Sequence, residues 1–157
     1  MGELLPGSWI VAATNFPMWL TGERLSPTFT YELVSSSPLV FTDVVTYLTA
    51  ETEQKKSEEK TIVGQDTWRH DELVWRGKGL LRFFASHWTV SGASEDGNVV
   101  AIQFSKSLAT PSGIDIIIRD GVEVPELRAL IARNTELFGL SPEQFASLSW
   151  LVHGHQG

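Results

Sequence analysis

The side chain with most chemical potential in this sequence is a carboxylate in an apolar setting. Strand alternation places Asp43 on one face together with Leu39, Phe41, Val45 and Tyr47. If that face meets solvent, Asp43 is an ordinary surface charge. If it meets a closed interior, loss of hydration raises the pKa of the carboxyl toward that of a general acid or base. The direction of Asp43 therefore decides whether acid–base catalysis is available.

Three other side chains could complete a catalytic set with this carboxylate. Tyr47 lies on the same face as Asp43 and could donate to an oxyanion, while Arg76 and His87 lie in later strands and could pair with Asp43. Simple alternation puts His87 on the face opposite Trp88, and hence outside, but a polar-lined cavity would invert that assignment. The catalytic set of Asp43, Tyr47, His87 and Arg76 is conditional on an enzymatic function.

Other kinds of chemistry find no support in the sequence. It contains no cysteine, which excludes disulfides and a thiol nucleophile. It has no phosphate-binding loop, dinucleotide fingerprint, zinc protease motif or Gly-x-Ser-x-Gly elbow. His153 and His155 supply only two metal ligands near the C-terminus, too few for a designed site. No metal site and no cofactor are therefore expected.

Charge and hydropathy restrict the partners and the compartment. A net charge of −7 argues against nucleic acid and anionic membranes as partners. No stretch has the roughly twenty apolar residues of a membrane span, so stable membrane insertion is not expected. The first six residues lack the basic region and apolar core of a secretion signal, which makes the cytoplasm the expected location.

Eight short strands that follow one another at hairpin spacing are predicted along the first three-quarters of the chain. Their ranges are 5–14, 28–34, 39–48, 61–68, 73–78, 87–91, 99–105 and 114–119. In the first strand, alternation places Trp9, Val11 and Ala13 on one face. This pattern predicts an all-β domain over 1–157, an eight-stranded antiparallel up-and-down barrel with room for a small ligand. The mixed-charge stretch 50–60 is expected to be a solvated hairpin tip without a function.

The hydrophobic period changes near the C-terminus. Apolar residues recur at helical spacing between Pro125 and Gly139, which predicts an amphipathic helix over 124–138 packed outside the barrel. Ser141 and Gln144 form a capping box that opens a second short helix. A last short strand is predicted over 148–152.

The connection over 15–27 is unusually apolar for a loop. It contains Phe16, Met18, Trp19 and Leu20. Two interpretations remain open: a loop packed on the outside of the core, or a lid folded over the mouth of a cavity.

Taken together, these segments resemble the lipocalin family, in particular its bacterial and plant outer-membrane-type branch, here without a secretion signal. Gly7-Ser8-Trp9 is similar to the family's Gly-x-Trp at the closed end of the barrel. The stretches 29–33, 81–90 and 116–121 resemble later strands, whereas 92–97 departs from the turn found in many relatives. The resemblance implies that Arg119 packs over Trp9.

Six tryptophans and eight phenylalanines favour a cavity lined with aromatic rings over a filled aliphatic core, which agrees with a carrier and with an enzyme. With the resemblance, which implies binding of hydrophobic small molecules, the predicted function is a carrier or sensor for a hydrophobic or amphipathic small molecule. The predicted ligand-binding residues are Phe16, Met18, Trp19, Leu20, Phe29, Tyr31, Phe41, Trp75 and Trp88. One alternative is a cofactor-independent isomerase, lyase or cyclase that uses acid–base residues inside the barrel. Another is a protein-interaction barrel with a filled interior. A homodimer is compatible with each.

Overall fold

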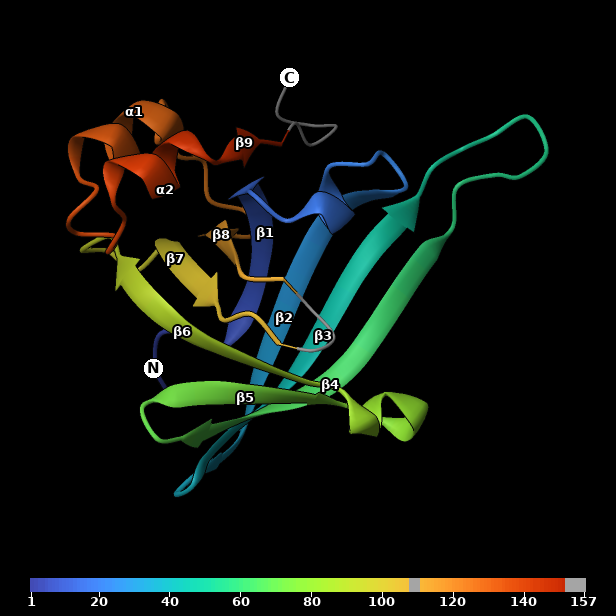
Figure 1. The fold of residues 1–157 in the computed structure, drawn as a ribbon, viewed down its shortest axis with the longest axis horizontal. Coiled ribbons are helices and arrows are strands. Elements are labelled where there is room, and N and C mark those ends of the chain that lie inside the picture. The colour runs from blue at the N-terminus through green and yellow to red at the C-terminus, as the bar shows by residue number, and fades with distance from the viewer. Residues whose placement is uncertain (108–110, 152–157) are drawn as a thin grey trace.

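Eight antiparallel strands form a closed barrel in the computed structural model of the chain, which describes residues 1–107 and 111–151 (Figure 1). The strands are β1 (Gly7–Thr14), β2 (Arg24–Ser36), β3 (Leu39–Thr49), β4 (Glu59–Arg69), β5 (Glu72–Gly77), β6 (Ala85–Ala93), β7 (Val99–Phe104) and β8 (Gly113–Arg119). Each strand pairs with the next, and β1 pairs with both β2 and β8, which closes the barrel. The predicted eight-stranded up-and-down barrel is confirmed.

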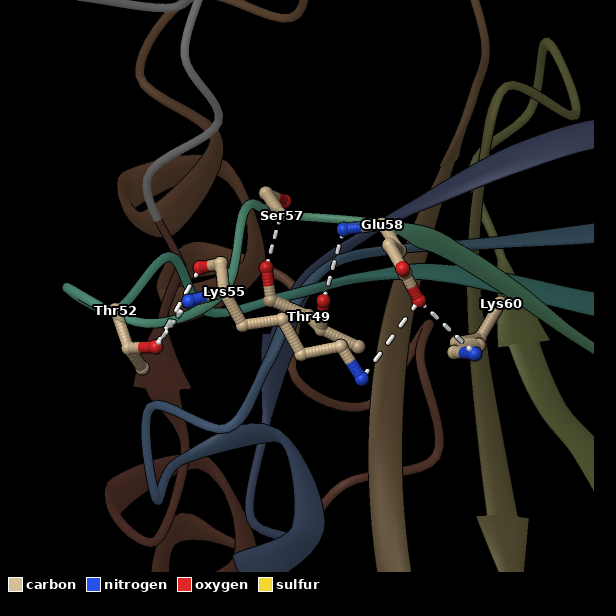
Figure 2. Close-up of polar contacts among 6 residues, drawn as sticks. All are labelled: Thr49, Thr52, Lys55, Ser57, Glu58 and Lys60. Carbon is tan, nitrogen blue, oxygen red and sulfur yellow. Dashed lines mark hydrogen bonds and ion pairs between the residues drawn. The ribbon is translucent and has the colours of Figure 1, made fainter.

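The β2–β3 and β3–β4 hairpins run beyond the predicted strands. The β2–β3 ladder extends from Arg24↔Thr49 to Ser36↔Leu39. The tip of the β3–β4 hairpin, between Thr49 and Glu59, extends away from the barrel (Figure 1). Local polar contacts stabilise it (Figure 2). There the Glu58 amide donates to Thr49 Oγ1 at 2.8 Å, and Lys60 Nζ lies 3.2 Å from Glu58 Oε2. Because these groups are exposed, the tip is a solvated turn, as expected.

Both faces are largely buried in three strands, β1, β7 and β8. Inside the barrel, Trp9 and Val11 of β1 belong to one apolar cluster, while Ile10 and Ala12 belong to a second cluster outside it. The C-terminal segments cover this second cluster, over β1, β7 and β8 (Figure 1). These segments are α1 (Leu127–Arg133), α2 (Pro142–Ala146) and β9 (Ser149–Trp150), which pairs with the end of β1.

The predicted helix over 124–138 is much shorter in the structure. Glu126 has a left-handed backbone (φ 53°), so α1 begins only at Leu127. The helix ends at Arg133, and the side chain of the capping residue Asn134 donates to the Leu130 carbonyl at 2.8 Å. Ile131 and Phe138 are buried nonetheless, because turns carry the chain back to the barrel. A side chain at Gly92 would collide with the backbone at Phe138, so only glycine permits this close approach. The capping box at Ser141 is present as predicted.

The contact between Arg119 and Trp9 closes one end of the barrel. The Arg119 guanidinium lies 4.2 Å from the centre of the Trp9 ring and donates to the carbonyls of Pro6 and Leu4 at 3.1 and 2.8 Å. The Trp9 indole in turn donates to the Leu5 carbonyl at 2.8 Å. Gly7 has a φ of 122°, and a Cβ there would lie 2.9 Å from Arg119 Nη1. The expected contact between Arg119 and Trp9 is therefore confirmed.

We predict that Trp9→Ala lowers the free energy of unfolding by roughly 3–5 kcal/mol, because it leaves a large cavity beneath Arg119. Leu80→Ala is the control: Leu80 is 85% exposed, so its truncation should cost no more than about 0.5 kcal/mol. Urea unfolding followed by fluorescence measures both. Equal midpoints for the two variants would contradict the role assigned to Trp9.

Candidate functional site

The end of the barrel opposite Trp9 contains a cavity of about 280 Å³. The strand connections β1–β2, β3–β4, β5–β6 and β7–β8 all lie at this end. Most of the lining is apolar and aromatic, with a few polar side chains; the lining residues are Phe16, Met18, Trp19, Arg24, Phe29, Tyr31, Asp43, Val45, Ile62, Trp75, Ser86, Phe104 and Asp115. The interior of the barrel is therefore not completely filled by side chains.

The apolar connection between β1 and β2 forms part of the cavity wall. It contains a short 3₁₀ turn, η1 (Pro17–Trp19). Phe16 and Trp19 are buried and line the cavity, and Met18 lines it while remaining 37% exposed. Phe16 packs edge-on against Phe104, with ring centres 5.2 Å apart, and lies over Gly113, where a Cβ would collide with its ring. Of the two interpretations of this connection, the structure matches the one in which it covers the cavity.

Asp43 points into the barrel and is 5% exposed. In the β2–β3 ladder it stands directly opposite Tyr31, and in β3–β4 it faces Gly64. Loss of hydration, the negative charge of Asp66 and a hydrogen bond between the two carboxyls raise the pKa of Asp43 well above its usual value. The carboxylate therefore has the buried position that acid–base chemistry requires.

Asp66 is a second buried carboxyl, and its charge acts on Asp43. Two carboxyls can hydrogen-bond to each other only if one is protonated. Burial raises the pKa of Asp66, while the hydrogen bonds from Asp43 and from the Trp88 indole lower it; Trp88 Nε1 donates to Asp66 Oδ1 at 2.9 Å. Each carboxyl keeps one buried oxygen without a hydrogen-bond partner among the described residues, Asp43 Oδ1 and Asp66 Oδ2.

Asp115 supplies a third buried carboxyl from β8. A β-bulge between Val11 and Ala13 reverses the alternation of β1, so that Ala13 joins the outer cluster and Thr14 turns inward beside Asp115. The Thr14 hydroxyl accepts from the Phe16 amide at 3.0 Å and hydrogen-bonds to the carboxyl. Burial raises the pKa of Asp115 to about 7, and the Thr14 bond partly offsets this shift. Its Oδ1 atom is buried without a partner in the described part of the chain.

Tyr31 stands among the three carboxyls. Its ring stacks on Trp88 with centres 5.7 Å apart. Burial raises the pKa of the Tyr31 hydroxyl well above 10, and the charges of Asp43, Asp66 and Asp115 raise it further. Tyr31 therefore stays protonated and can donate a hydrogen bond inside the cavity.

The structure separates the predicted catalytic set. Tyr47 shares the inner face with Asp43 but lies at the rim, where its ring contacts Trp19 and the Arg24 guanidinium lies 5.7 Å from its centre. Tyr31, predicted only as a ligand contact, is the tyrosine next to Asp43.

Arg76 and His87 are not beside Asp43, which corrects the predicted pairing. Arg76 is exposed. His87 has a 42% exposed side chain, and its Nδ1 lies 2.7 Å from Glu72 Oε1 on the outer surface. The reason is alternation: Trp88 points inward, so its neighbour His87 points outward, and the polar cavity does not invert the order.

The predicted ligand contacts divide into two groups. Six of them line the cavity: Phe16, Met18, Trp19, Phe29, Tyr31 and Trp75. Leu20 is 42% exposed, and Phe41 and Trp88 are buried in the core beside the cavity without being part of its lining. Whether any of them contacts a ligand remains a prediction.

Asp66, Asp115 and Arg24 were not predicted as site residues, although a signal existed for two of them. Alternation puts Asp66 on one face with Ile62 and Trp68, as it puts Asp43 among apolar residues. Asp115 lies four residues before Arg119, and so on the face that covers Trp9. Alternation thus indicated that both carboxyls point inward, whereas their height in the barrel depends on the register of the strands.

No helix among the described residues is long and apolar enough to cross a membrane. Within the same residues, no group of three or more histidine or acidic side chains is arranged to hold a metal ion. His153 and His155 lie outside the residues that the structure describes.

A closed eight-stranded barrel with a cavity at one end and a short C-terminal helix is the lipocalin fold. Solved structures share this architecture: apocrustacyanin C2, with a TM-score of 0.65 and 9% identity over 98% of this chain and 79% of that one; lobster apocrustacyanin A1, with 0.60 and 9% over 98% and 80%; and apocrustacyanin C1, with 0.64 and 11% over 96% and 78%. At such identities the likeness establishes the fold alone. No protein-family model and no curated protein matches the sequence.

We predict that the free energy of unfolding falls as pH rises from about 4 to 7. Folded Asp115 keeps its proton up to a pH of about 7, whereas the unfolded carboxyl loses it near its ordinary pKa of 3.8. The folded state thus binds more protons in this window, and each such carboxyl lowers stability by about 1.4 kcal/mol per pH unit.

Asp115→Asn should therefore make the pH dependence shallower, and Asp120→Asn, at an exposed position just after β8, should leave it unchanged. Urea unfolding at pH 5 and pH 7 measures both. Parallel stability curves for wild type and Asp115→Asn would show that Asp115 is already ionised in the folded protein.

Proposed function

We propose that this protein is a carrier or sensor that binds a hydrophobic or amphipathic small molecule inside its barrel. The observation that supports this proposal is the aromatic cavity itself, which has a few polar groups placed within an apolar wall, as in small-molecule sites generally. Several large rings contribute to the wall, including Trp19, Trp75 and Phe104. The structural neighbours are themselves described as apoproteins, which is consistent with ligand binding on this fold.

A filled interaction barrel is less compatible with the geometry, because the interior retains the cavity. Gly64 illustrates how the space is arranged: a Cβ there would collide with the Trp75 indole, so the glycine lets this ring lie against the wall.

Four further expectations from the sequence stay proposals. They are membership of the outer-membrane-type lipocalin branch, the cytoplasmic location, the absence of nucleic-acid partners and the homodimer.

We predict that a polarity-sensitive dye binds the cavity and that Val45→Trp weakens this binding at least about tenfold by occupying the space. The matched control is Val63→Trp on the neighbouring strand. Val45 lines the cavity, whereas Val63 is 38% exposed on the outer face. Dye fluorescence and calorimetry, with circular dichroism to verify folding, measure the effect. Equal dye affinity for the two folded variants would place the dye outside the cavity.

A second candidate function, a cofactor-independent isomerase, lyase or cyclase, is favoured by one specific observation. Asp43 is a buried carboxyl with a raised pKa in the lining of the cavity, and Tyr31 is a neighbouring hydrogen-bond donor. A buried carboxylic acid of this kind can protonate a substrate near neutral pH, and such a group typically contributes about 10²–10⁴-fold to a rate.

We predict for this alternative that Asp43→Asn abolishes turnover of a neutral substrate while its affinity changes by less than about tenfold, since the proton acts mainly in the transition state. The measurement is product formation by mass spectrometry over a library of unsaturated ketones and terpenoids, with Asp120→Asn as control. Unchanged turnover in Asp43→Asn would eliminate acid–base catalysis by this carboxyl and leave the binding protein standing.

A further inference from the structure

We infer that the ligand of this cavity carries a basic nitrogen: the site is built for an amphipathic amine, bound as its ammonium ion, rather than for a fatty acid. This inference rests on the proposed binding function and names its ligand class. It depends on the unpartnered carboxylate oxygens, the charge balance of the interior and the aromatic wall.

Two carboxylate oxygens in cavity-lining residues have no hydrogen-bond donor among the described residues. Asp43 is 5% exposed and Asp115 is 1% exposed, and both residues line the cavity. The Oδ1 atom of each is the buried, unpartnered one. Buried acceptors without donors are costly, and an ammonium group brings three donors to such a site.

The interior also lacks a compensating cation. Within the described part of the chain, the three ion pairs involve Glu58 and Glu72 on the outside of the barrel, and none reaches Asp43, Asp66 or Asp115. Among the described residues that line the cavity, Arg24 is the one cationic side chain, and its guanidinium lies over the Tyr47 ring at the rim. The two carboxyls that line the cavity, Asp43 and Asp115, thus have one cationic side chain in the same lining, and it lies at the rim. A positively charged ligand would balance their charge.

The aromatic wall suits the same ligand class. Ammonium groups are attracted to the faces of tryptophan and tyrosine rings, and Trp19, Tyr31 and Trp75 all line the cavity. Phe29 and Phe104 supply apolar surface for a hydrocarbon body. A carboxylate ligand in the same position would instead lie beside Asp43 and Asp115, where like charges repel.

The test compares three probes with one hydrocarbon chain: octylamine, octanol and octanoate. Each is titrated at pH 8 against wild-type protein carrying the polarity-sensitive dye, with calorimetry as a second readout. At this pH octylamine is charged, as a lysine side chain is. We expect octylamine to bind at least tenfold more tightly than octanol, and octanoate to bind most weakly.

Asp115→Asn should lower octylamine affinity about tenfold and leave octanol unchanged, while Asp120→Asn should affect neither. A second measurement does not depend on any variant: the octylamine affinity of wild type should rise between pH 5.5 and pH 8 as Asp115, whose pKa burial raises to about 7, loses its proton. Asp43 also lines the cavity, and Asp66 lies beside Asp43. The other titratable groups that line the cavity are Arg24 and Tyr31, and the raised pKa of Tyr31 keeps its hydroxyl protonated throughout this range.

The outcomes separate the two proposals. If the dye and octanol bind but octylamine shows no preference over octanol, or if octanoate binds as tightly as octylamine, the amine inference is overturned and the binding function stands. If neither the dye nor any probe binds, both are overturned. Octylamine preference in wild type that persists unchanged in Asp115→Asn would also overturn the inference, because the charge would then be recognised elsewhere.

Discussion

The double pairing of β1 is the constraint on which the rest of this structure depends. One strand of eight residues hydrogen-bonds to both β2 and β8, and in doing so turns an open sheet into a closed barrel. Because both of its faces are buried, β1 needs an apolar cluster inside and a cover outside. Trp9, which packs against Arg119, belongs to the inner cluster, and the C-terminal segments cover the outer face. Closure also removes the sheet edges that would otherwise be open to pairing with other chains.

Closure has an electrostatic consequence at the other end. Inward-facing side chains of adjacent strands converge, so carboxyls that are far apart in the chain share one small volume of low polarity. Burial raises the pKa of Asp43, of Asp66 and of Asp115, and that of Asp115 reaches about 7. Burying such groups opposes folding, and hydrophobic burial elsewhere in the barrel offsets the cost. Shifted pKa values of this kind are frequent at sites where a protein interacts with a small molecule.

Small residues set the shape of the cavity as much as large ones do. Gly64 and Gly113 leave room for the rings of Trp75 and Phe16, so each aromatic side chain lies against the wall at a position where a Cβ would collide with it. On the outer surface, Gly92 permits the turns after α1 to approach β6, and the Ser91 hydroxyl donates to the Phe138 carbonyl at 2.8 Å. Glycines that allow close approach therefore shape the cavity and also let the C-terminal segments pack against the barrel.

The sequence by itself determined the strand count, the up-and-down topology and the apolar face that Asp43 shares, because alternation and turn residues are local properties of the chain. Alternation also placed His87 outside correctly, and the resemblance to a known family placed Arg119 over Trp9. Only the tertiary structure decided which polar groups meet. The bulge in β1 reversed the faces of Ala13 and Thr14, a left-handed Glu126 shortened the predicted helix, and the curvature of the barrel brought Asp66 and Asp115 to Tyr31 while leaving Arg76 outside. These contacts depend on the register of the strands and on closure of the barrel, which bring together residues that are distant in the sequence and that no local sequence pattern relates.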